Sequence, residues 1–252
     1  MADWSDPRTG AYVTAGAGAE ARDAGLRSYM LSVYNYMASG VLLTGIVALL
    51  FAKSGAVDVL FTLQQTSRGV GYAPSLLGWV VMLAPLGIVL LMSFGQMRLS
   101  TPAMQALYWT YATLMGLSLS TIFLQYTDMS IAQVFFATAA GFAGLSLWGY
   151  TTKRDLSGLG TFLIMGVVGL IVASIVNLFL NSGPLSMAIS AIGVLLFAGL
   201  TAYDTQKIKS MYSYVAGTDM QGKAVVMGAL TLYLDFINMF LFLLRLFGSQ
   251  RN

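Results

Sequence analysis

Two aspartates in apolar surroundings are the residues of this sequence best placed to do chemistry. Asp235 lies in the middle of the otherwise apolar stretch 224–244, and Asp204 closes the apolar stretch before it. A carboxylate near the centre of a bilayer costs roughly 2.5–3.5 kcal/mol on insertion scales, so it is rarely found there without a partner or a task. We therefore expect Asp235 to be functional, with a contact that only joins helices as the alternative. For Asp204 alone, an interfacial salt bridge is an equal alternative.

Together, the two acids could respond to pH. If their carboxyl groups meet, they cannot both ionise cheaply, so they would share one proton and titrate as a unit. The chain contains no histidine, which leaves a carboxyl pair as its means of sensing pH near neutrality. Carboxylate oxygens also suit a hard cation, so Asp204 and Asp235 are the candidate contacts for calcium. No other cofactor is indicated.

The helix that carries Asp235 has one narrow polar face. Gly228, Thr231, Asp235, Asn238 and Phe242 follow helical steps, whereas the other faces hold Leu, Ile, Phe and Met. Such a stripe should face the interior of a bundle or a water-filled cavity. Asp235 lies about 11 residues, or roughly 16 Å, beyond the expected start of its helix, so contact with Asp204 would need a tilt.

Arg98 is the candidate counter-charge. It directly follows the apolar stretch 69–97 and is expected on the same side of the membrane as Asp204. There it could pair with the ionised carboxylate and close a cavity. An ordinary anchor at the membrane interface is an equal alternative.

The elements that must position these residues are membrane-spanning helices. The chain of 252 residues is 57% hydrophobic and 9% charged, against about 25% charged in soluble domains. This composition predicts an all-α polytopic membrane protein, and the net charge of +3 gives no indication of nucleic-acid binding. Residues 1–28 are polar and expected to form a mobile tail, which leaves 29–248 as the transmembrane domain. Charge-free windows and a turn at 181–184 predict spans at about 29–52, 76–97, 103–126, 130–152, 157–180 and 185–205. The apolar stretch around Asp235 predicts the last span, at 224–244.

Basic residues in the short loops predict the orientation. From Arg22 onward, eight Lys and Arg residues fall on the N-terminal side of the membrane and four on the other side. Because positive charge stays in the cytoplasm, the N-terminus is expected inside and the C-terminus outside. The expected location is the inner (plasma) membrane of the cell.

The segments around the two aspartates resemble the signature motifs of the Bax inhibitor-one family. The resemblance covers roughly residues 25–248, and the motifs are long and specific. The matching segments are 149–156, 177–179, 203–206 with 208–209, and 232–240 with 243–245.

The resemblance implies a compact bundle with the last helix at its centre. It also implies a pH-sensitive cation leak, chiefly for calcium, gated at a pair of aspartates. Asp204 and Asp235 stand at the positions of that pair, and Arg98 matches a latch arginine near the end of the second helix.

Two other classes of function compete with a channel. Some bacterial members of the family bind a membrane-anchored ATP-dependent protease, and eukaryotic members suppress cell death, so the protein could be a regulatory partner that uses residues 1–28 as a handle. An intramembrane aspartyl protease also uses two aspartates, but only half of its pattern is present. Tyr203-Asp204 fits, whereas Asp235 follows Tyr233-Leu234 in place of Gly-x-Gly, so no enzyme is expected. The oligomeric state is left open.

Overall fold

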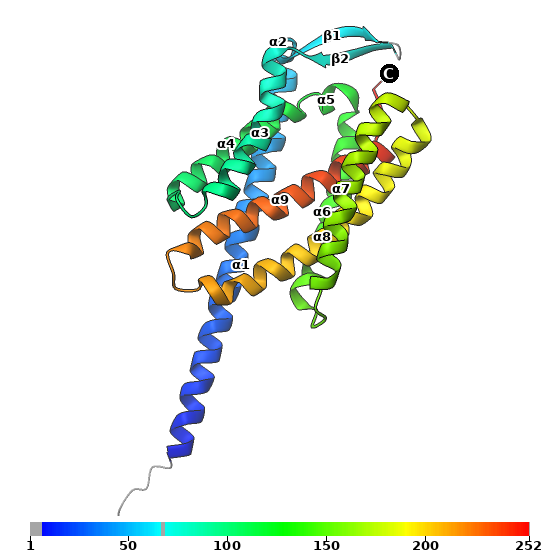
Figure 1. Cartoon of the computed structure of the whole chain (residues 1–252). Coiled ribbons are helices and arrows are strands. Elements are labelled where there is room, and N and C mark those ends of the chain that lie inside the picture. Colours follow the sequence, from blue (N-terminus) through cyan, green and yellow to red (C-terminus); the bar gives the residue numbers. More distant parts are fainter. Residues whose placement is uncertain (1–6, 67–68, 252) are drawn as a thin grey trace, which may run out of the picture.

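The computed structural model describes residues 7–66 and 69–251, and within these ranges the chain is almost entirely helical (Figure 1). Among the described residues, seven helical segments are long and apolar enough to cross a membrane. The all-α prediction with seven spans is therefore confirmed. The spanning helices are α1 (Pro7–Lys53), α3 (Leu76–Gly95), α4 (Thr101–Leu119, followed by α5, Ile122–Gln125), α6 (Asp128–Thr151), α7 (Ser157–Leu180), α8 (Gly183–Val215) and α9 (Met220–Phe247).

Helix α9 forms the centre of the bundle. Of the most apolar 18-residue stretch of α9, 61% is buried inside the protein, against 11–44% of the corresponding stretches in the other spans. It packs against α1, α4, α6 and α8, while α3 packs on α4 and α7 packs on α8. Edge-to-face aromatic contacts fill the centre, with ring centroids 5.6 Å apart for Phe142 and Phe236 and 5.2 Å apart for Tyr111 and Tyr233. The last helix is central as expected, with α3 and α7 in outer positions.

Short polar residues begin several of these helices. Ser100, Thr127 and Ser182 each accept a hydrogen bond from a backbone N–H in the first turn of α4, α6 and α8, respectively. Asn181 ends α7 in a left-handed conformation with φ 52°, which a short polar side chain tolerates. The chain therefore reverses at 181–184, as the turn residues there predict.

A small hairpin at one end of the bundle is absent from the sequence prediction. After α2 (Val57–Leu60), strands β1 (Phe61–Thr66) and β2 (Gly69–Pro74) pair antiparallel, with Phe61 opposite Pro74. Phe61 is buried with Val57, Leu60 and Val81, so the hairpin is attached to the helices through its first residue.

Two helices extend beyond their predicted ends. Helix α1 begins at Pro7, so residues 7–28 continue it where a mobile tail is expected, and this part projects beyond the bundle (Figure 1, blue). The six alanines of this part favour a helix and its four glycines do not, and it lacks an apolar face. Residues 1–6 lie outside the described part of the chain. Helix α8 continues to Val215, so its predicted end at 205 is wrong.

Helix α8 continues because its last turns still pack on α9 and α1. Ile208 is buried, and the ring of Tyr212 lies 5.4 Å from that of Tyr29 on α1. The extension is too polar to be recognised as part of a span, but it buries enough surface to stay helical.

Candidate functional site

Asp204 on α8 and Asp235 on α9 face each other. Their side chains lie within hydrogen-bonding reach of each other, and both are buried, with 9% and 4% of their surfaces exposed. An ionised carboxylate can only accept, so a hydrogen bond between two carboxyl groups needs a proton on one of them. The structure therefore brings the two predicted acids close enough for one proton to be held between them.

The length of α8 explains why the two acids meet. Asp204 lies eleven residues before Val215, where α8 ends, and Asp235 lies fifteen residues after Met220, where α9 begins. The two helices are antiparallel neighbours joined by a short turn, in which Gly217 adopts a φ of +72°. Both carboxyl groups therefore lie at a similar depth along the hairpin. The expected separation along the axis disappears once α8 is extended.

The polar stripe of α9 faces α8 along its whole length. Two turns before Asp235, Gly228 lies against Ile208, since a Cβ at Gly228 would lie 3.2 Å from Ile208 Cγ2. Two turns after Asp235, the ring of Phe242 lies against Gly193, where an added Cβ would come within 2.7 Å of Phe242 Cδ2. Asp235 is thus directed into the α8–α9 interface.

The other two polar residues of the stripe bond within their own helix. Thr231 Oγ1 donates to the carbonyl of Met227 over 3.0 Å, and Asn238 Nδ2 donates to the carbonyl of Leu234 over 2.8 Å. They supply polar surface along the interface but form no hydrogen bond with the acids in the described structure.

One buried oxygen of Asp235 is left without a hydrogen-bond donor. Asp235 Oδ2 is buried and finds no hydrogen-bond partner among the described residues. Such an atom is costly to bury and marks a place where a proton, water or cation could bind. Calcium takes six to eight oxygen ligands, whereas the described residues hold no cluster of three or more potential metal-ligating side chains. The two carboxyl groups by themselves therefore do not supply a full set of calcium ligands.

Arg98 is not joined to the pair. It is exposed in the turn after α3, and the ion pair found among the described residues is Arg251–Asp128, at 3.1 Å. The cation that acts electrostatically on Asp204 is Lys207, on the next turn of α8. A latch between Arg98 and Asp204 stays a prediction.

The α6–α7 loop is fastened to α8 beside the pair. Gln206 Nε2 donates to the carbonyl of Arg154 over 2.8 Å, and its Oε1 accepts from the N–H of Leu156 over 2.9 Å. Lys209 Nζ donates to the carbonyl of Tyr150 over 2.7 Å. Segments 149–156 and 203–209, matched separately in the sequence, are therefore in contact.

Asp155, in the same loop, does not add to a pH response near neutrality. It is exposed, and hydrogen bonds from the side chain and backbone of Ser157 hold the pKa of Asp155 below its ordinary value. It therefore stays ionised until the pH falls well into the acid range.

Replacing Gln206 with leucine is expected to loosen this loop. The change removes two hydrogen bonds and should lower the free energy of unfolding by about 1–3 kcal/mol, measured as thermal unfolding in detergent. Gln133→Leu is the matched control, because Gln133 is exposed on α6 and makes no hydrogen bond in the described structure. Equal melting of the two variants would contradict the fastening role.

Two hydroxyl networks tie neighbouring helices to the acid-bearing helices. Tyr34 on α1, Ser146 on α6 and Thr205 on α8 form a chain with hydrogen bonds of 2.7 and 2.8 Å. Thr44 on α1 bonds Tyr233 on α9 over 2.7 Å. Sequence reasoning matched Thr205 and Tyr233 as parts of the family motifs but predicted none of these contacts, because the partners are far apart in the chain. The one sequence signal for these hydroxyl groups is that Thr205 and Tyr233 lie within two residues of an aspartate.

The fold and the site define a class: a multi-pass helical membrane protein with a buried carboxyl pair in its central hairpin. The profile of the family described as "Inhibitor of apoptosis-promoting Bax1" matches residues 26–252. The chain therefore belongs to the Bax inhibitor family, as its motifs indicate.

Bacterial relatives match it over nearly their whole length. The inner membrane protein YbhL of Escherichia coli is 46% identical over 231 residues, which cover 90% of this chain and 94% of that protein. Uncharacterized proteins of Rickettsia prowazekii and Caulobacter vibrioides are 51% and 49% identical, over 91% of this chain and 93% and 92% of theirs.

Proposed function

We propose that this protein is a pH-sensitive cation leak, with calcium as the transported ion, gated by Asp204 and Asp235. The observation that carries the proposal is the buried contact between the two carboxyl groups, with one oxygen of Asp235 left without a donor. While the pair shares its proton, the hydrogen bond holds α8 and α9 together and the pair carries one negative charge. Loss of the proton leaves two like charges, which repel each other and attract a cation.

A polar cavity on the outer side supports a path to the pair. About 680 Å³ in volume, it lies between α7, α8 and α9 and is lined by Asn177, Ser186 and Asn238, among others. Asn238 lies one helical turn beyond Asp235, so water that enters this cavity approaches the pair along the polar stripe of α9. In the proposed orientation the N-terminus is cytoplasmic and the cavity opens outside. The pair has no catalytic role in this proposal.

The test is calcium flux into liposomes that contain the purified full chain. Flux above that of empty liposomes is expected, and it should rise as the pH is raised from about 5 to 8, because deprotonation opens the pair. Absence of flux above empty liposomes at every pH would refute the channel.

Helix α1 supports a second candidate function. Its N-terminal part projects beyond the bundle as a helix (Figure 1), which suits capture by a partner on the N-terminal side. In this version the protein regulates a membrane-anchored ATP-dependent protease without transport, and the aspartates only join helices.

Deleting residues 1–24 tests this second candidate. The deletion removes the projecting part but leaves the packing of Tyr29 against Tyr212. Co-purification with the protease should be lost while the melting temperature of the bundle is kept. Continued co-purification of the shortened protein would contradict the role of the projecting helix.

A further inference from the structure

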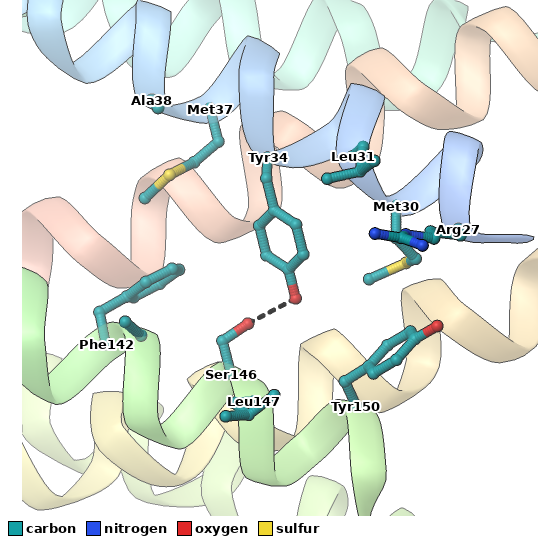
Figure 2. A pocket seen from close by; sticks show the side chains of 11 residues that line it. Arg27, Met30, Leu31, Tyr34, Met37, Ala38, Phe142, Ser146, Leu147 and Tyr150 are labelled. Atoms are coloured by element: carbon teal, nitrogen blue, oxygen red, sulfur yellow. Dashed lines mark hydrogen bonds between the residues drawn. The ribbon is translucent and has the colours of Figure 1, made fainter.

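Helices α1 and α6 leave a groove between them, along residues 27–38 of α1 and 142–150 of α6. Each packs mainly on other helices, α1 on α4 and α9 and α6 on α8 and α9, and a cavity of about 520 Å³ remains at their seam. This volume lies within the range of about 300–1,000 Å³ that is usual for ligand pockets. Figure 2 shows its two walls, with Met37 and Leu31 on α1 facing Phe142 and Leu147 on α6.

The groove is open towards the bilayer. Leu31 and Leu147 at its rim are exposed, although both belong to membrane-spanning segments. From Arg27 to Ala38 the α1 wall is about 16 Å long, which is close to the hydrocarbon depth of one leaflet, roughly half of 30 Å. Met30 and Met37 provide a flexible apolar lining that adapts to an irregular chain. An acyl chain of the surrounding lipid has the matching length and chemistry.

One end of the groove is basic. Arg27 and Tyr150 lie together at that end (Figure 2), and Arg27 forms no ion pair with any described residue. Lys209 is close by, with its Nζ 4.9 Å from the centre of the Tyr150 ring. No acidic side chain lines the cavity. Asp23, one turn before Arg27, is exposed and forms no ion pair with it. The positive charge of Arg27 is therefore not paired within the described structure, and this end of the groove favours an anion.

The cavity at the other end of the same seam differs in charge. It has a volume of about 450 Å³ and is also apolar, but it is lined by both Lys53 and Asp128. An acidic side chain therefore lies in the wall of this cavity, where Asp128 is paired with Arg251 at 3.1 Å. The basic end near Arg27 therefore distinguishes the first groove from an ordinary gap between lipid-facing helices.

A hydrogen bond joins the two walls of this groove. Tyr34 reaches across from α1 to Ser146 on α6 (Figure 2), with the two oxygens 2.7 Å apart, and Ser146 is in turn bonded to Thr205. The bridge sets the distance between the walls, so the groove has a fixed width before any chain enters it.

We propose that the groove between α1 and α6 binds one anionic phospholipid of the surrounding membrane. An acyl chain lies along Met37 and Phe142, and the phosphate lies against Arg27 with Lys209 nearby. Binding of this lipid is independent of whether the protein conducts ions.

Native mass spectrometry of the full chain released from nanodiscs tests the proposal. The nanodiscs contain equal amounts of phosphatidylglycerol and phosphatidylcholine with the same acyl chains. The wild type is expected to retain one phosphatidylglycerol in preference to phosphatidylcholine. Arg27→Gln should reduce this preference about fivefold, the contribution expected of one basic residue. Arg22→Gln is the matched control and should keep the preference, because Arg22 does not line the groove.

Filling the groove gives the second arm. Ala143 is exposed on the α6 wall, whereas Ala140, also exposed on α6, does not line the groove. Ala143→Trp should abolish retention of the lipid and Ala140→Trp should preserve it, with Ala38→Trp on the opposite wall in reserve if the first variant does not fold. Equal retention of the two lipids by the wild type would overturn the proposal. So would unchanged retention in folded Ala143→Trp, since the lipid would then be bound only at the general protein surface.

Discussion

Flux through the Asp235→Asn variant is expected to lose its dependence on pH and to stay at the low level that the wild type shows in acid. Asparagine keeps the size of the side chain and can donate a hydrogen bond to Asp204, so the α8–α9 contact should persist at every pH. The variant cannot gain the second negative charge that, in the proposed mechanism, opens the pair. Calcium uptake into liposomes from about pH 5 to 8 is the measurement.

The expected loss at high pH is large. Two unit charges 4 Å apart interact by about 4 kcal/mol at an effective dielectric constant of 20, and a tenfold change corresponds to about 1.4 kcal/mol. Removing one of the two charges should therefore lower flux at pH 8 at least about tenfold. Asp204→Asn should behave alike, because the two carboxyl groups act as one pair.

Asp219→Asn is the matched control for both variants. Asp219 is exposed just before α9 and forms no cap with its side chain, so its replacement should leave flux and pH response unchanged. A pH response that survives in Asp235→Asn would refute gating by the pair. If the flux of Asp235→Asn equals that of the wild type at every pH, Asp235 serves only to join helices.

The spans were predictable because the bilayer imposes them. A helix that crosses the hydrocarbon needs about 20 residues without charge, and lipid provides no partners for an unfolded backbone. Charge-free windows, the turn at 181–184 and the apolar stretch around Asp235 therefore located all seven spans. The same reasoning says nothing of helix outside the bilayer, which is why the start of α1 and the end of α8 were misplaced. The hairpin at 61–74 was missed for the same reason, since its strands are short and not strongly apolar.

The candidate site was predictable in its residues but not in its contacts. A lone acid in an apolar stretch is conspicuous, so Asp235 is found from composition alone, and the helical period places Thr231 and Asn238 on its face. Whether Asp204 touches Asp235 depends on where α8 ends, and that depends on the packing of Ile208 and the residues after it. Hydrogen bonds such as Tyr34–Ser146 join ordinary polar residues from different helices and leave no pattern in the sequence.

Replacing Gly149 with alanine is expected to destabilise the contact between α6 and α8. A Cβ at Gly149 would clash with the carbonyl oxygen of Ala202 on α8, and the obstacle is backbone, which cannot rotate away. Overpacking of this kind costs about 1–3 kcal/mol, which should exceed the gain of up to about 1 kcal/mol from replacing glycine in a helix. Thermal unfolding in detergent measures the net change.

Gly144→Ala separates the clash from the helix propensity. Gly144 lies on the same helix, and nothing comes within 4 Å of a Cβ added there, so this variant should be as stable as the wild type or slightly more stable. The two variants should differ by about 2 kcal/mol, or roughly 4–8 °C in melting temperature. Because Ala202 precedes Asp204 by two residues, a displaced α8 would also move the carboxyl pair, so Gly149→Ala should alter the pH response of flux where Gly144→Ala does not. If both variants melt together and conduct alike, the close approach of α6 and α8 does not position Asp204, and the depth of the pair must be set by the α8–α9 hairpin alone.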